Sequence, residues 1–145
     1  MMNDPLSSEE ALSAFLRGFE DGSWPGKEWT HRSHVIMAAC YLTAESADNV
    51  TPLIRNNIKK YNLSQGGENT DSSGYHESLT IFWIRVIDDF LRHLPASLPR
   101  LAQVKAAADE FGDRRKLFED YWTFDVVKSV EARRAWVEPD RQPLP

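Results

Sequence analysis

Apolar residues recur at helical spacing along almost the whole chain, and this repetition most constrains the fold. Near the N-terminus, Leu12, Phe15, Leu16 and Phe19 follow the i, i+3, i+4, i+7 spacing that places side chains on one face of an α-helix. No segment alternates apolar and polar residues over a useful length, as a half-buried β-strand would. The sequence therefore predicts an all-α protein.

Capping residues, glycines and prolines divide this pattern into segments. Ser7 and Glu10 resemble a capping box for the first helix, Thr30 should cap the second, and Thr51 with Pro52 should start the third. We expect five main helices, over about residues 8–22, 31–44, 51–61, 76–94 and 99–111, and short ones over about 114–121 and 130–136.

The chain length fits one folding unit. A chain of 145 residues can bury enough surface for one core without disulfides or metals. The last ten residues, 136–145, hold three prolines and should form an extended tail. We therefore predict a single domain over residues 1–145, a helical bundle of about five main helices plus short C-terminal helices.

Charge and hydropathy exclude two classes of partner. The net charge of -5 lacks the basic excess that binding to a phosphate backbone requires, so nucleic acid is not expected. No segment approaches the roughly 20 apolar residues that span a bilayer, and the first residues lack the features of a secretory leader. The single cysteine, Cys40, allows no internal disulfide and is expected to fill space in the core. We expect a soluble cytoplasmic protein, and its many aromatic residues suggest a homodimer.

Three histidines stand at the beginnings of two helices. His31 shares the apolar face of the second helix with Val35, and His34 lies on the flank of that face. His76 begins the fourth helix. With links of moderate length, helices two and four run parallel and their N-termini meet. We therefore expect the three histidines to converge on one pocket, covered by the Gly-rich segment 62–74 as a lid or binding loop.

These histidines suggest two kinds of chemistry. The positive end of a helix disfavours imidazolium, so each ring should be neutral and able to bind a metal or accept a proton. His31, His34 and His76 are the predicted ligands of a divalent transition metal: zinc, iron or manganese. Without a metal, they would act as general acid and base. In either case Glu77, Tyr75 and Thr80 would position a small substrate, and the leading interpretation is a small enzyme.

Other interpretations remain open. A second interpretation is a noncatalytic module that holds a small ligand or docks a protein, and a third is a bundle whose histidines only tie helix ends together. The HxxH spacing is weak evidence alone, and Glu77 can simply balance a positive helix end. Bound metal with an open coordination position would favour the enzyme. An apolar pocket whose histidines are hydrogen-bonded to the backbone would favour the binding module.

Four segments together carry a resemblance. These are "WTHRSH", "IRNNIKKYN", "GYHESLTIFW" and "ARRAWVEPDRQPLP". They resemble a family of small uncharacterised bacterial all-helical proteins with WTHxxH, GYHExxT and ARxxWVEPDxxPLP signatures, from about Trp29 to the C-terminus. The resemblance implies a bacterial cytoplasmic protein and brings no known reaction. DinB-like metal-binding bundles are similar in size, but they carry an HxxxH pair late in the chain, whereas HxxH occurs early here.

Overall fold

The computed structural model describes residues 4–145, and six α-helices make up most of this part of the chain. No β-strand occurs among these residues, which confirms the predicted all-α fold. The helices are α1 (Glu9–Asp21), α2 (His31–Ala44), α3 (Ala47–Ser64), α4 (Glu77–Arg92), α5 (Arg100–Phe111) and α6 (Val130–Arg134). Two short 3-10 turns, η1 (Gly26–Glu28) and η2 (Leu117–Asp120), lie between them.

Side-chain caps set the start of the first two helices. Thr30 forms the predicted cap of α2: its hydroxyl accepts a hydrogen bond from the Ser33 N–H at 3.3 Å, and the Ser33 hydroxyl accepts one from the Thr30 N–H at 3.2 Å. The prediction for α1 was wrong by one residue. Ser8, and not Ser7, is the cap, with its hydroxyl accepting from the Ala11 N–H at 3.0 Å.

The third helix begins earlier and ends later than its sequence pattern suggests. Ser46 caps α3 by accepting a hydrogen bond from the Asn49 N–H, so the helix begins at Ala47 and not near Thr51. Pro52 therefore lies inside the helix, where its missing N–H leaves one carbonyl of the first turn without its usual partner. The helix continues to residue 64, so the loop predicted over residues 62–74 is shifted to residues 65–76.

The helices after α5 are shorter than predicted. Residues 114–121 contain only the 3-10 turn η2, and α6 ends at Arg134 because Ala135 takes an extended backbone with φ of -150°. The tail beyond α6 has no helix and is held by side chains. Ser78 of α4 donates to the Ala135 carbonyl at 2.8 Å and accepts from the Val137 N–H at 3.0 Å. The Trp122 indole donates to the Val137 carbonyl at 3.2 Å.

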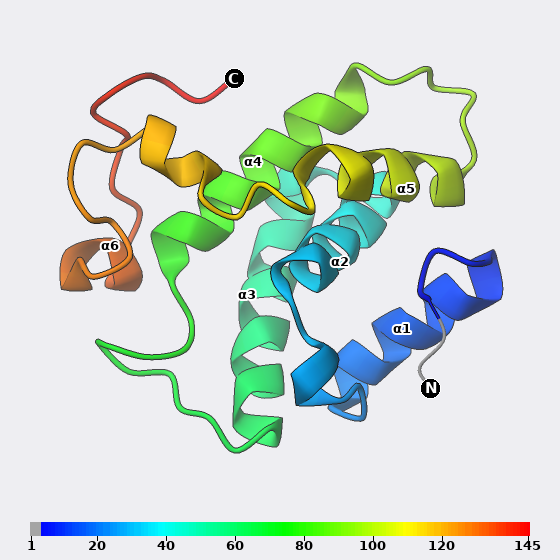
Figure 1. Ribbon diagram of the computed structural model, residues 1–145, viewed down its shortest axis with the longest axis horizontal. Coiled ribbons are helices and arrows are strands. Elements are labelled where there is room, and N and C mark those ends of the chain that lie inside the picture. The colour runs from blue at the N-terminus through cyan, green and yellow to red at the C-terminus, as the bar shows by residue number, and fades with distance from the viewer. Residues whose placement is uncertain (1–3) are drawn as a thin grey trace.

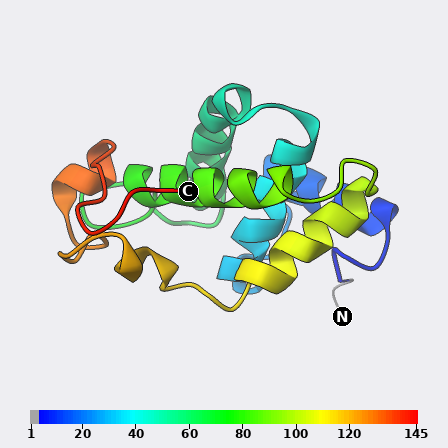
Figure 2. The ribbon, with the colours of Figure 1, turned by 90° about the horizontal axis from the view of Figure 1, so that it is seen from above.

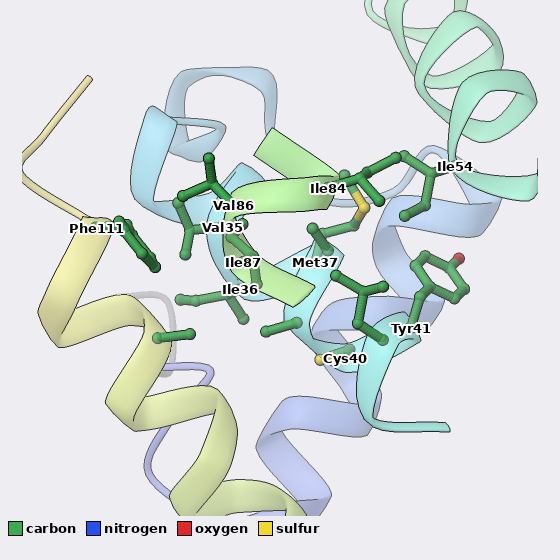
Figure 3. Packing of buried hydrophobic residues seen from close by; sticks show 14 of the residues in the cluster. Val35, Ile36, Met37, Cys40, Tyr41, Ile54, Ile84, Val86, Ile87 and Phe111 are labelled. Atoms are coloured by element: carbon green, nitrogen blue, oxygen red, sulfur yellow. The ribbon is translucent and has the colours of Figure 1, made fainter. Parts of the chain in front are cut away.

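The core centres on α2, which is buried around almost its whole circumference. Figure 3 shows Val35, Ile36 and Met37 of this helix beside Ile84 of α4 and Phe111 of α5. Cys40 is 1% exposed, in agreement with the predicted role as a core filler. One connected cluster of buried apolar side chains joins the main helices.

The chain direction of the central helices matches the topological prediction. In Figure 1, α2 and α4 rise toward the same side of the molecule, and α3 descends between them in chain order. Figure 2 shows the segment around α6 lying beside the N-terminal end of α4. Over residues 4–145, the helices are too short or too polar for any of them to span a bilayer.

Candidate functional site

A cavity of about 640 Å³ lies between α2, α3, α4 and two irregular segments, residues 65–76 and 112–127. This volume is in the usual range for small-molecule sites. Most of its wall is apolar. The apolar lining residues are Val35, Met37, Ala38, Ile54, Ile58, Leu79, Trp83, Ile84, Ile87, Phe118 and Val127.

All three histidines singled out in the sequence line this cavity. His31 is the first residue of α2, and His34 follows one turn later. His76 precedes α4 as its N-cap, one position before the first turn in which the sequence placed it. The N-terminal ends of α2 and α4 both border the cavity, which brings residues 45 positions apart to the same space.

Both ring nitrogens of His76 are used by the backbone. Nδ1 accepts a hydrogen bond from the Leu79 N–H at 3.2 Å, and Nε2 donates to the Val126 carbonyl at 2.8 Å. The ring therefore caps α4 and also holds the irregular segment on the other side of the cavity. Burial is the main cause that lowers the pKa of His76 below its usual value. Its neutral form is the one that these two partners require.

Both ring nitrogens of His34 are also hydrogen-bonded, one to the backbone and one to a side chain. Nδ1 donates to the Thr30 carbonyl at 3.0 Å, and Nε2 accepts from the indole N–H of Trp29 at 3.1 Å. Trp29 is itself fixed by stacking on Phe19, with ring centroids 4.9 Å apart. Burial lowers the pKa of His34 to about 4, so this ring is also neutral.

His31 differs from the other two. Its Nε2 donates to the Phe111 carbonyl at 3.0 Å, and its ring lies against the Trp83 ring with centroids 4.7 Å apart. Its Nδ1 has no hydrogen-bond partner among residues 4–145. Burial lowers the pKa of His31, so Nδ1 is an unprotonated acceptor.

The predicted three-histidine metal site stays a prediction. Within residues 4–145, no three or more histidine, cysteine or acidic side chains are grouped so that they could hold a metal ion. Of the six ring nitrogens, only Nδ1 of His31 lacks a partner. Coordination by all three residues would require His34 and His76 each to give up a backbone or indole partner.

The residues predicted to position a substrate are divided between two places. Tyr75 and Thr80 line the histidine cavity, whereas Glu77 lines a neighbouring polar hollow that Tyr75 also borders. The Thr80 hydroxyl donates to the His76 carbonyl at 2.8 Å. Glu77 is paired with Arg55, whose Nε and Nη2 donate to its two carboxylate oxygens at 2.9 and 2.8 Å.

Glu77 is held as a carboxylate. Burial alone would raise its pKa, but the hydrogen bonds from Arg55 and from the Tyr75 hydroxyl, at 2.6 Å, outweigh this and lower it. Burial and the bond to Glu77 raise the pKa of Tyr75, which remains a phenol. Glu77 therefore has neither the place nor the protonation state of a general acid in the histidine cavity.

The loop over the cavity is fastened at several points. The Asn69 side chain accepts from the Tyr75 N–H at 3.1 Å and donates to the Lys59 carbonyl at 3.1 Å. Gly74 has φ of 80°, and any side chain there would clash with the carbonyl of Glu68. Arg133 of α6 donates to the Gly74 carbonyl at 2.9 Å. These contacts fix the loop to α3 and α6.

Part of the wall was missed in the sequence. The segment after α5 contributes five lining residues: Arg115, Lys116, Phe118, Glu119 and Val127. Its sequence "DRRKLFED" is highly charged and has too little periodicity to indicate which side chains face inward. Trp83 also lines the cavity, beside His31.

Comparison with protein-family models, with curated proteins and with solved structures finds no match to this chain. The resemblance noted above therefore stays a prediction. Inferences about function must rest on the cavity and its polar groups.

Proposed function

We propose that this protein binds a small, largely apolar molecule in the histidine cavity and acts as a noncatalytic binding module. One observation carries this proposal: the cavity has apolar walls, and its histidines are hydrogen-bonded mostly to the backbone. Groups fixed in this way shape a site and cannot easily move protons.

The size of the cavity supports useful affinity. A ligand that buried about 300 Å² of apolar surface would gain roughly 7 kcal/mol at about 25 cal/mol per Å². The loss of translational and rotational freedom opposes this gain. We therefore expect dissociation constants between about 1 μM and 1 mM for fragments that fill only part of the site.

The test is to fill the cavity with a side chain. Ala38 lies on the cavity wall and is 5% exposed, so Ala38→Leu would occupy part of the space. Neutral one- and two-ring aromatic compounds would be screened by ligand-observed NMR and measured by calorimetry. Binding should be present in the wild type, retained in the control Ala102→Leu on α5, and at least tenfold weaker in Ala38→Leu. Equal binding in all three proteins, or in none, would contradict the proposal.

The second candidate is a metal-dependent or histidine acid/base enzyme acting on a small molecule. It is favoured by the fact that His31, His34 and His76 line one cavity. Releasing a buried backbone partner costs about 1–3 kcal/mol, whereas zinc binding to a structural site can contribute about 10–16 kcal/mol. The free energy of metal binding is therefore large enough to offset a local rearrangement of the histidines. Tyr75 and Thr80 would be the residues nearest a bound substrate.

Elemental mass spectrometry distinguishes the two candidates. Untagged protein would be purified without chelator and incubated with zinc, iron and manganese, beside His34→Ala and His76→Ala. Near one equivalent of metal in the wild type, lost in both variants, would favour the enzyme. Ligand binding without metal would favour the binding module.

Two further expectations concern the setting of the protein. The sequence features and the bacterial resemblance support a cytoplasmic location. A homodimer is supported by exposed apolar side chains, of which Phe124, Val127 and Val130 lie in one short segment and are 43%, 37% and 43% exposed. Sedimentation velocity at several concentrations would test the dimer, with Val130→Asp as the variant expected to weaken it.

A further inference from the structure

Most hydrogen-bond donors of the polar side chains that line the histidine cavity already have a partner in the protein. Thr80 donates to the His76 carbonyl, and Tyr75 donates to Glu77. His34 and His76 each use one ring nitrogen as a donor and the other as an acceptor. A ligand group that needs several donors would find few in these walls.

Three lining side chains keep unused groups: Asn62, which donates to Asn69 and has no partner for its amide oxygen among residues 4–145, and the neighbouring rings of His31 and Trp83. Nδ1 of His31 is an acceptor without a partner, and Nε1–H of Trp83 is a donor without a partner among residues 4–145. In the same part of the chain, the fully buried unpaired nitrogens belong to Trp24, Arg100 and Arg133, and the Trp83 nitrogen is not one of them. The two rings lie 4.7 Å apart. Both residues line the cavity, so an unpaired acceptor and an unpaired donor belong to adjacent rings of its wall.

We infer that the ligand is a neutral molecule with an apolar body and one hydroxyl group, which donates to His31 Nδ1 and accepts from Trp83 Nε1–H. This inference rests on the proposed binding function and names the class of ligand. A hydroxyl group satisfies both unpaired atoms at once, because it is a donor and an acceptor.

Charged ligands fit less well. The charged lining residues Arg115, Lys116 and Glu119 are all exposed, and they belong to the segment after α5. An ionised carboxylate or ammonium buried among apolar side chains loses its hydration, which costs several kcal/mol unless it is paired. A cation would also face the positive ends of α2 and α4.

Three probes of one shape provide the test: 2-naphthol, naphthalene and 2-naphthoate, measured by calorimetry at pH 7.5 on the full chain. We expect 2-naphthol to bind about tenfold more tightly than naphthalene and 2-naphthoate to bind most weakly. Trp83→Phe removes the indole N–H and keeps an aromatic ring. His31→Leu removes the Nδ1 acceptor together with the donor to the Phe111 carbonyl. In each variant the ratio between the affinities for 2-naphthol and naphthalene should fall from about ten to about one.

The control is Trp136→Phe, because the Trp136 indole donates to Glu138 and lies outside the cavity lining. This variant should keep the tenfold preference. Equal affinities for naphthalene and 2-naphthol in the wild type would overturn the inference and leave the binding function intact. Tightest binding by 2-naphthoate would also overturn it and would indicate an anionic ligand. Failure of all three probes to bind would contradict the binding function itself.

Discussion

The two sides of the histidine cavity are built differently. The side formed by α2, α3 and α4 consists of deeply buried apolar residues, such as Val35, Ile54 and Ile87, which are at most 1% exposed. The opposite side consists of irregular chain fastened by single polar side chains, such as the bond from His76 to the Val126 carbonyl. Burial distributes stability over many contacts, whereas each polar tie acts alone. The irregular side should therefore loosen while the helical side remains folded.

The largest effect should follow a change on the helical side. Ile87→Ala removes three carbon atoms from a fully buried site and should lower the free energy of unfolding by about 3 kcal/mol. Urea denaturation would measure this loss, and hydrogen exchange should show lower protection in all helices. Ile81→Ala, on the partly exposed side of α4, should cost less than half as much. A smaller loss for Ile87→Ala than for its control would break the comparison.

The next effect concerns the histidines at which the two sides meet. Because the folded pKa of His34 is about 4, the unfolded chain binds more protons between about pH 6.5 and pH 4. Stability is therefore fully present above this range and is lost as the pH falls through it. From His34 alone we expect a loss of about 2 kcal/mol between pH 7 and pH 5. His31 and His76 have lowered pKa values and add to the loss.

Urea denaturation at pH 7 and pH 5 would measure this difference. His34→Gln should reduce the pH dependence, while His93→Gln, at an exposed position, should leave it unchanged. A profile that is flat over this range, or unaffected by His34→Gln, would show that the buried histidines do not control acid stability.

A local effect should follow Ser78→Ala, which removes the tie from α4 to the irregular chain after α6. The Ser78 hydroxyl serves both the Ala135 carbonyl and the Val137 N–H, and its loss should cost about 1.5 kcal/mol. Hydrogen exchange should increase mainly over residues 121–137, while α2 and α3 keep their protection. Ser97→Ala, on the exposed turn before α5, is the control and should change neither measurement. Uniform loss of protection would mean that the two sides unfold together.

The smallest effect should follow Arg134→Gln. Arg134 pairs with Asp71 at the exposed surface, where water and salt screen the interaction. We expect no measurable shift in the urea midpoint. Arg133→Gln should lower the midpoint, because this neighbour donates to the carbonyls of Gly74, Tyr75 and Val127. Equal shifts of the urea midpoint in the two variants would mean that the more buried Arg133 bonds stabilise the protein no more than the exposed Arg134 pair does.

The same contrast explains what the sequence could predict. Helical periodicity and the Thr30 cap predicted α2 and α4 closely, but α3 begins at Ala47 and not near Thr51. Chain direction was sufficient to bring His31, His34 and His76 to one cavity. The apolar residues of the irregular side do not recur at a regular spacing. Its course depends on contacts between residues far apart in the chain, such as His76 with Val126, for which a single sequence has no local signal.

The hydrogen-bond partners of the site residues were harder to predict than the positions of these residues in the fold. The sequence indicated that the histidines would be neutral, but it could not indicate that backbone carbonyls would occupy their nitrogens. It also grouped Glu77 with them, although the turn that places His76 on the cavity points Glu77 toward Arg55. Adjacent residues at a helix start face different directions, and only the packing of α3 against α4 decides which side Glu77 faces.

Tyr75 forms part of the partition between the histidine cavity and the polar hollow around Arg55. A side chain in this position affects how fast a ligand enters and leaves the cavity more than it affects the affinity for that ligand. If a bound molecule leaves through the hollow, the ring must rotate and the 2.6 Å bond to Glu77 must break first. The residence time of the ligand would then depend on the strength of one hydrogen bond that the ligand never touches.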